Sequence, residues 1–145
     1  MTQNEALNLL MIGHNIFLTG QAGSGKTYLL NEFVRFLKSK KAGVAVTAST
    51  GIAATHLNGS TIHSWSGIGI KKEMSDKDVL RLNSNLVARL RIQAPKVLVI
   101  DEISMFHSYR LDAVNRICKI IRNNEEPFGG LQVILCGDFF QLPPV

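Results

Sequence analysis

The chain has 145 residues, of which 46% are hydrophobic and 19% charged, a composition typical of one folded domain rather than a disordered chain. Lysine and arginine number 16 against 11 for aspartate and glutamate, and the net charge of +5 allows a polyanionic partner such as nucleic acid. No stretch reaches the roughly 18 apolar residues of a membrane span, and no basic leader precedes an apolar run at the N-terminus, so we expect neither membrane association nor secretion. Cys118 and Cys136 lie in apolar stretches, which predicts reduced thiols and an intracellular protein: cytoplasmic in a bacterium, nuclear or mitochondrial in a eukaryote.

Short apolar strands alternate with helical patterns along the chain. In chain order, the first half predicts a helix over 2–12, a buried strand over 15–19, a glycine-rich loop over 20–27, an amphipathic helix that ends before Gly43, a strand over 44–47, a short helix over 51–57 and a loop over 58–72. The second half predicts a helix from Ser75 to Pro95, a buried strand over 97–100, a helix through Leu111 to Ile121 and a strand over 133–136.

The helix expected between Ser75 and Pro95 depends on two local signals. Ser75 and Asp78 have the spacing of a capping box. One apolar stripe then continues to the proline through Val79, Leu82, Leu86 and Leu90.

Strands of this kind alternating with helices are typical of βαβ units. We therefore expect an α/β fold with a mostly parallel sheet and helices on both of its faces.

The sequence GQAGSGKT, from Gly20 to Thr27, matches the P-loop pattern G-x-x-x-x-G-K-[ST] at every fixed position. Its context also fits, because a strand precedes it and an amphipathic helix follows. Glycines allow backbone N–H groups to surround a phosphate, and the start of the following helix favours negative charge. We expect Lys26 to reach the β- and γ-phosphates and the Thr27 hydroxyl to hold Mg²⁺. The alternative is a glycine-rich turn with an exposed lysine.

The sequence VLVIDEIS predicts a second part of the same site. A buried strand ending in Asp101 and Glu102 places two carboxylates at the carboxyl edge of the sheet, where ligands bind in open α/β folds. We expect Asp101 to hold Mg²⁺ through water and Glu102 to polarise the attacking water. A solvated acidic turn is the alternative, but the P-loop upstream makes nucleoside triphosphate hydrolysis the favoured interpretation.

A third polar element, GDFFQLPPV, follows the last predicted strand. It places Asp138 and Gln141 near the same edge, and the Gln141 amide could hydrogen-bond a γ-phosphate and respond to its loss. Taken alone, the segment also fits a turn closed by two prolines.

Six motifs occur in this order between Gly20 and Val145: GQAGSGKT, TASTGIAA, GSTIHSWSG, VIDEIS, PFGG and GDFFQLPPV. The set closely resembles the PIF-type DNA helicases of superfamily 1, subfamily B, and more distantly RecD. The resemblance implies a RecA-like P-loop NTPase domain covering residues 1–145, with an adenine-side helix over 1–12 and a P-loop core over 15–145. It also implies ATP as substrate, Mg²⁺ as cofactor and movement along single-stranded DNA in the 5′-to-3′ direction.

Individual residues follow from the resemblance. Gln3 falls where the family has its adenine-recognising glutamine, and Gln141 where the family couples the γ-phosphate to the DNA. The residues expected to contact ATP are Gln3, Gly20, Ala22, Gly23, Ser24, Gly25, Lys26, Thr27 and Tyr28, with Lys26, Glu102 and Gln141 acting in catalysis. The residues expected to contact single-stranded DNA are Thr47, Ser49, Thr50, Gly51, Thr61, His63, Ser64 and Trp65.

Chemistry agrees with the DNA assignment, since hydroxyls and backbone amides can hold phosphates and Trp65 or His63 could stack on a base at about 1–3 kcal/mol. For Trp65 a place in the core is an equal alternative.

The chain stops directly after GDFFQLPPV, which predicts a fragment without the second RecA-like domain and its arginine finger. On its own it is expected to bind Mg-ATP weakly, hydrolyse it very slowly and unwind no DNA. Two alternatives stay open: an ATP-dependent switch that never touches DNA, and a DNA-binding module with an inactive nucleotide site. Phosphate chemistry alone does not require TASTGIAA, GSTIHSWSG or GDFFQLPPV, so these motifs weigh against a switch that never touches DNA. The inactive nucleotide site is disfavoured because Lys26, Thr27, Asp101 and Glu102 are all intact.

Overall fold

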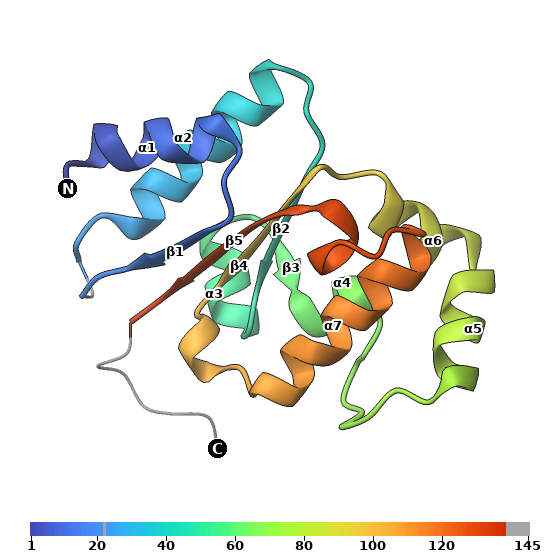
Figure 1. Ribbon diagram of the computed structural model, residues 1–145. Coiled ribbons are helices and arrows are strands. Elements are labelled where there is room, and N and C mark those ends of the chain that lie inside the picture. The colour runs from blue at the N-terminus through green and yellow to red at the C-terminus, as the bar shows by residue number, and fades with distance from the viewer. Residues whose placement is uncertain (22, 139–145) are drawn as a thin grey trace.

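The computed structural model describes residues 1–21 and 23–138, and a five-stranded sheet forms its centre (Figure 1). The strand order is β1-β5-β4-β2-β3, and every neighbouring pair is parallel, as predicted. The strands are β1 (Ile16–Thr19), β2 (Val44–Ala48), β3 (Ser60–Thr61), β4 (Val97–Asp101) and β5 (Gln132–Gly137).

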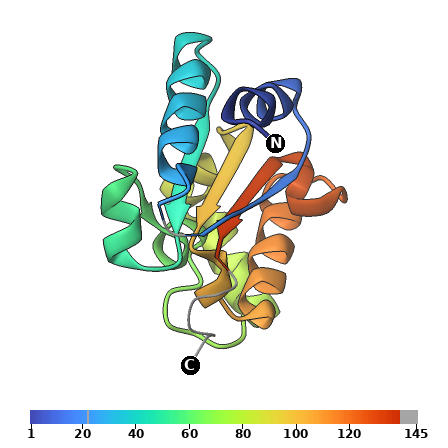
Figure 2. The ribbon, with the colours of Figure 1, turned by 90° about the vertical axis from the view of Figure 1, so that its left-hand side faces the viewer.

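Helices cover both faces of this sheet, which confirms the α/β fold (Figure 2). They are α1 (Gln3–Ile12), α2 (Lys26–Ser39), α3 (Gly51–His56), α4 (Ile62–Ser66), α5 (Asp76–Ser84), α6 (Leu86–Gln93) and α7 (Ser108–Ile121), with 3₁₀ turns η1 (Ile103–Met105) and η2 (Pro127–Gly130). Figure 2 shows α2 and α3 on one side of the sheet and α7 on the other.

The central strand β4 explains why two cores form. All of its residues are buried, and successive side chains of a strand point to opposite faces. Val97 and Val99 therefore pack with α1 and α2, whereas Leu98 and Ile100 pack with the α4–α7 side. A continuous apolar strand of this kind is stable only when both faces are covered.

The expectation that the first strand is buried is wrong. Strand β1 lies at the edge of the sheet, and Phe17 is 44% exposed. Its side chains alternate between half-buried and exposed. The exposure of β1 results from its place at the edge in the strand order, and strand order cannot be read from the local sequence.

The region from Ser75 to Pro95 forms two helices rather than one. The capping box of Ser75 and Asp78 is present at the start of α5, as predicted. The helix ends at Asn85, whose extended backbone and side-chain oxygen cap α6 by accepting from Ala88 N at 3.0 Å. This break changes the buried face: Ala88 and Ile92 point inward, whereas Leu86 and Leu90 of the predicted stripe are exposed.

The predicted loop over 58–72 contains secondary structure. Strand β3 pairs with β2, and α4 follows it directly. The Thr61 hydroxyl caps α4 by accepting from Ser64 N at 3.2 Å. Burial of Ile62 and Trp65 then stabilises a helix too short to persist without tertiary contacts.

The prediction of unpaired core thiols is confirmed, because Cys118 and Cys136 are free and buried. Burial raises the pKa of Cys118 to about 12, and burial together with the nearby Asp101 raises the pKa of Cys136. Both thiols are therefore protonated and unreactive at neutral pH. Within residues 1–21 and 23–138, no helix is long and apolar enough to cross a membrane.

Candidate functional site

The glycine-rich loop joins β1 to the start of α2 at the carboxyl edge of the sheet. Lys26 is the first residue of α2, and its ammonium group donates to the carbonyl oxygens of Gly20 and of Gln21, the latter at 3.0 Å. Gly23 and Gly25 have φ values of +82° and +91°, which side chains disfavour. The sequence pattern therefore produces the loop geometry that a P-loop requires.

Helix α1 brings Gln3 to this loop from a different part of the chain. The Thr2 hydroxyl caps α1 by accepting from Glu5 N at 3.1 Å, so Gln3 lies in the first turn. A Cβ atom at Gly25 would overlap the side-chain amide of Gln3, which shows how closely the two residues approach. The φ value requires glycine here, and a side chain at this position would also displace the Gln3 amide.

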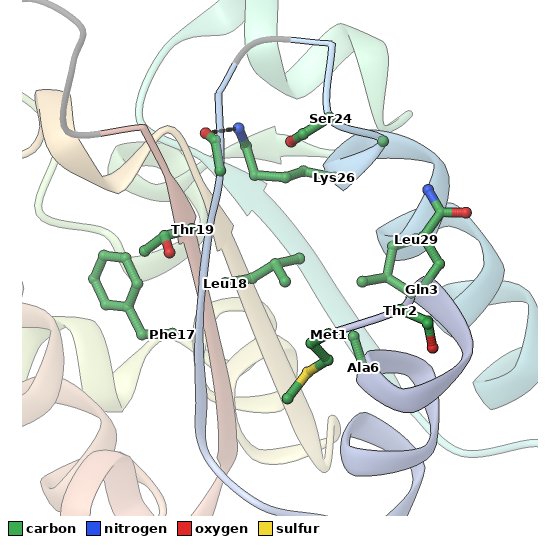
Figure 3. A pocket seen from close by; sticks show the side chains of 12 residues that line it. Met1, Thr2, Gln3, Ala6, Phe17, Leu18, Thr19, Ser24, Lys26 and Leu29 are labelled. Carbon is green, nitrogen blue, oxygen red and sulfur yellow. Dashed lines mark hydrogen bonds between the residues drawn. The ribbon is translucent and has the colours of Figure 1, made fainter.

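A cavity of about 370 Å³ lies between α1, β1 and the loop (Figure 3). Figure 3 shows Leu18 pointing toward Leu29, while Phe17 points to the other side of the strand. Of the predicted ATP contacts, the cavity is lined by Gln3, Gly20, Ser24, Gly25 and Lys26. Apolar walls and a few polar groups are typical of a nucleotide-base pocket.

The other predicted ATP contacts lie outside this lining. Gly23 is exposed, Thr27 lies in the first turn of α2, and Tyr28 is 60% exposed. Ala22 and Gln141 lie outside the described residues.

The two carboxylates predicted at the end of β4 lie side by side in different environments. Asp101 is buried, and its Oδ1 accepts from Glu102 N at 2.8 Å. Glu102 is half-buried and has a left-handed backbone with φ of 56°, which costs a residue with a side chain about 1–2 kcal/mol. Such strain persists only where surrounding contacts hold it.

Burial raises the pKa of the Glu102 carboxyl, and the negative charges of Asp101 and Asp138 raise it further. Lys26 and His56 act in the opposite direction. A carboxylate with a raised pKa is a stronger base. Lys26 at the start of α2 and the acidic pair of Asp101 and Glu102 at the end of β4 lie at the same carboxyl edge of the sheet, so the P-loop and this pair share one site.

Asp138 reaches the same edge because β5 pairs with β4. It follows β5 directly and is buried. A Cβ at Gly137 would approach Ile103 Cγ2 to 3.0 Å, so the missing side chain lets η1 lie against the end of β5. The predicted meeting of Asp101, Glu102 and Asp138 at one edge is thus what the structure contains.

The site offers few ligands for a metal ion from the protein alone. Among the residues that the structure describes, no group of three or more His, Cys, Asp or Glu side chains could hold a metal. Thr27 and Asp101 supply oxygen atoms, which are the donors that Mg²⁺ prefers. Their small number fits an ion that takes its other ligands from phosphate and water.

Two hydroxyls of the TASTG segment are used inside the protein. Thr47 is fully buried, and its Oγ1 donates to Val99 O at 2.7 Å. The prediction that Thr47 contacts DNA is therefore wrong. Ser49 is 9% exposed and donates its hydroxyl to Glu102 O at 2.7 Å, so this hydroxyl is not presented to DNA either.

The next two residues of this segment stay accessible. Thr50 is half-buried, and its hydroxyl caps α3 by accepting from Ala53 N at 3.2 Å. Gly51 is exposed, with open space where a side chain would be.

The predicted DNA contacts in and before α4 also include both accessible and buried residues. Ser64 is exposed and Thr61 half-buried. Trp65 is 5% exposed within the core cluster, so the base-stacking prediction for Trp65 is wrong and the core alternative is correct. Ile62 and Trp65 are three residues apart, so they lie on the same face of α4, and both side chains are buried on that face.

His63 of α4 packs against the segment that follows Glu102. Its ring meets Phe106 edge-on at 5.3 Å, and it is half-buried. Burial, and then the nearby Arg110, lower the pKa of His63. A lowered pKa favours the neutral imidazole, which cannot form an ion pair with a phosphate. Any DNA contact by His63 would therefore use stacking of its ring or a hydrogen bond.

One contributor was not expected from the sequence. His56 at the end of α3 lies close enough to Glu102 to lower its pKa. The sequence pointed to His56 only through its position in a short helix directly after β2, which keeps the last residue of that helix near the carboxyl edge of the sheet.

A parallel sheet with a glycine-rich loop between β1 and α2, and with acidic residues ending the neighbouring strands, defines a P-loop NTPase domain of the RecA-like type.

Comparison with known proteins narrows this class. The family model for PIF1-like helicases matches residues 3–145, and the chain belongs to this family. It is 57% identical to the ATP-dependent DNA helicase Pif1 of a Psychrobacter species over 145 residues, which cover all of this chain and 22% of that protein. The chain thus spans about a fifth of the length of this curated relative.

Solved structures agree in fold. The crystal structure of Pif1 helicase from Candida albicans superposes with a TM-score of 0.93 at 43% identity, covering 99% of this chain and 33% of that one. A Bacteroides Pif1 in complex with ADP-AlF3 and single-stranded DNA has a TM-score of 0.82 at 37% identity, covering all of this chain and 34% of that one.

Proposed function

We propose that this protein forms the ATP-binding part of a DNA helicase motor, which couples ATP hydrolysis to 5′-to-3′ movement on single-stranded DNA. The observation that carries the proposal is the meeting of Lys26, Asp101 and Glu102 at one sheet edge in a chain of the PIF1-like helicase family. The Psychrobacter relative is named an ATP-dependent DNA helicase. The 5′-to-3′ direction depends on the family resemblance.

The nucleotide would bind across the loop and the cavity beside α1. Backbone amides of the loop and the Lys26 ammonium would hold the phosphates, which requires Lys26 to release the carbonyls of Gly20 and Gln21. The Gln3 amide, placed against Gly25, would bind the base. The proposed contacts are Gln3, Gly20, Ala22, Gly23, Ser24, Gly25, Lys26, Thr27 and Tyr28.

Mg²⁺ is the metal that fits the donors present. The Thr27 hydroxyl and the Asp101 carboxylate would hold it, and when bound it neutralises charge on the phosphates. Glu102 would orient the attacking water and accept its proton at the carboxylate, a role supported by its raised pKa. Gln141 would respond to the γ-phosphate.

Single-stranded DNA would cross the same edge of the sheet. Structural accessibility supports Thr50, Gly51, Thr61 and Ser64 as contacts, with His63 contributing its ring. A Bacteroides relative is described as bound to single-stranded DNA, and the net charge of +5 suits a polyanion.

Movement along DNA would need a second RecA-like domain. Relatives several times longer than this chain have room for one. Closure of the two domains on ATP and reopening after hydrolysis would move the DNA in steps. The buried, reduced cysteines support an intracellular location.

A strand-displacement assay tests this function. The full-length protein with ATP is expected to unwind a duplex carrying a 5′ single-stranded tail and to leave a 3′-tailed duplex intact. Glu102→Gln is the matched control and should unwind neither. Equal unwinding of the 3′-tailed substrate would refute the direction, and no unwinding of any substrate would refute the helicase assignment.

A further inference from the structure

Ser49 connects the end of β2 to both residues of the acidic pair. Its backbone N–H donates to Asp101 O at 3.0 Å, and its hydroxyl donates to Glu102 O at 2.7 Å. The side chain is almost completely buried between these elements. One residue thus holds two successive carbonyl groups of the acidic turn.

The turn that Ser49 holds is strained. Glu102 has φ of 56° and ψ of 43°, a left-handed conformation that residues with side chains avoid. The Glu102 N–H donates to Asp101 Oδ1, and the Glu102 carbonyl accepts from Ser49 Oγ at 2.7 Å and from Met105 N at 3.2 Å. The peptide groups on both sides of Glu102 are therefore held, and they set the direction in which the Cα–Cβ bond of Glu102 leaves the backbone.

We propose that Ser49 is a positioning residue for Glu102, whose hydroxyl keeps the left-handed turn and so aims the Glu102 carboxylate at the attacking water. This inference rests on the proposed function, in which Glu102 is the base. Ser49 also immediately precedes Thr50 and Gly51, the accessible residues proposed to contact DNA. The same hydroxyl therefore links the proposed DNA path to hydrolysis.

This role differs from the one that family resemblance assigns to Ser49. A DNA contact needs a free hydroxyl on the surface, whereas the Ser49 hydroxyl is almost buried and already donates its proton to the Glu102 carbonyl. The two roles predict different kinetic effects. Loss of a DNA contact weakens DNA binding, whereas loss of a positioning contact slows the chemical step at saturating DNA.

The test is steady-state ATP hydrolysis by the full-length protein at a saturating concentration of a single-stranded oligothymidylate. Ser49→Ala is expected to lower kcat about 10- to 100-fold, because a small displacement of a catalytic group has effects of this size. The KM for ATP and the Kd for the oligonucleotide, measured without nucleotide, should change less than about twofold. Ser39→Ala is the matched control, since it removes a hydroxyl that donates to Phe36 O at the far end of α2, and it should leave kcat unchanged.

A second pair of variants separates the hydroxyl from the shape of the side chain. Ser49→Thr and Ser49→Val are nearly equal in volume, but only threonine keeps the donor. The threonine variant should recover most of the turnover and the valine variant should not, which keeps the test decisive if Ser49→Ala does not fold. Ser49→Ala combined with Glu102→Gln should be no slower than Glu102→Gln alone, because the positioned group is already gone.

A wild-type kcat in Ser49→Ala would overturn the inference, whether or not the variant binds the oligonucleotide more weakly. Additive losses in the double variant would also overturn it. Wild-type turnover in Glu102→Gln is a separate outcome, which would instead refute the proposed role of Glu102.

Discussion

Replacing Trp65 with alanine is expected to lower the free energy of unfolding by about 3–5 kcal/mol, the usual range for removing a large aromatic side chain from a core. The structure supplies the reason, because the indole is 5% exposed and packs in the cluster between the sheet and α4–α7. Burial of an aromatic side chain removes about 150–250 Å² from water. At about 25 cal/mol per Å² this is worth about 4–6 kcal/mol, an upper limit because unfolded chains already bury some of that surface.

Urea unfolding followed by circular dichroism measures this loss. Trp65 is the single tryptophan of the chain, so its fluorescence disappears with the substitution. Trp65→Phe should retain much of the stability, since the ring still fills most of the site. Leu90→Ala is the control: Leu90 belongs to the neighbouring α6 but is 53% exposed, and its loss should change stability by less than about 0.5 kcal/mol. An unchanged midpoint in Trp65→Ala, together with weaker binding of single-stranded DNA, would refute the core assignment and restore the stacking role.

Three further predictions concern catalysis, packing and pH. Glu102→Gln should reduce ATP turnover at least about 100-fold without weakening nucleotide binding, and wild-type turnover would remove Glu102 as the base. Arg122→Lys should cost about 2–3 kcal/mol in urea unfolding, because the guanidinium donates to the carbonyls of Ile92, Gln93, Pro95 and Gly129 and an ammonium cannot reach all four; unaltered stability would show that these contacts are replaced by water. Hydrogen bonds from Lys71 and from Ser75 lower the pKa of Asp78 from the usual 3.8 to about 2. The stabilisation by this carboxylate is therefore complete above its unfolded pKa and is lost as the pH falls toward 2, so the Tm difference between Asp78→Asn and wild type should shrink over that window. A difference independent of pH would contradict the assignment.

Local patterns were sufficient for the elements that position the nucleotide site. The strand and helix around Gly20–Thr27 and the buried strand before Asp101 each follow from consecutive residues, through periodicity and loop chemistry. Because the carboxyl ends of parallel strands share an edge, these predictions also placed Lys26, Glu102 and Asp138 together. The structure places them at one edge, because β1, β5 and β4 are parallel neighbours that end there.

The errors arise where tertiary contacts decide. Strand order placed β1 at an edge and exposed Phe17, although its sequence reads as a buried strand. The side chain of Asn85 can cap a helix or lie within one, and tertiary packing decides between the two. In the structure it caps α6, so the helix breaks there and α6 buries a different face from the predicted stripe. The hydroxyls of Thr47 and Ser49 could equally bind a ligand or a backbone carbonyl, and the sequence alone does not show that their partners are Val99 in β4 and Glu102 just after it.

The most direct measurement of the central claim is ATP hydrolysis by the full-length protein with and without single-stranded DNA, at one fixed low salt concentration. The account predicts strong stimulation by DNA, because the accessible DNA-side residues and the acidic pair are joined through the end of β2. Basal turnover that does not respond to single-stranded DNA would contradict it, and would identify an ATPase that works as a switch without DNA.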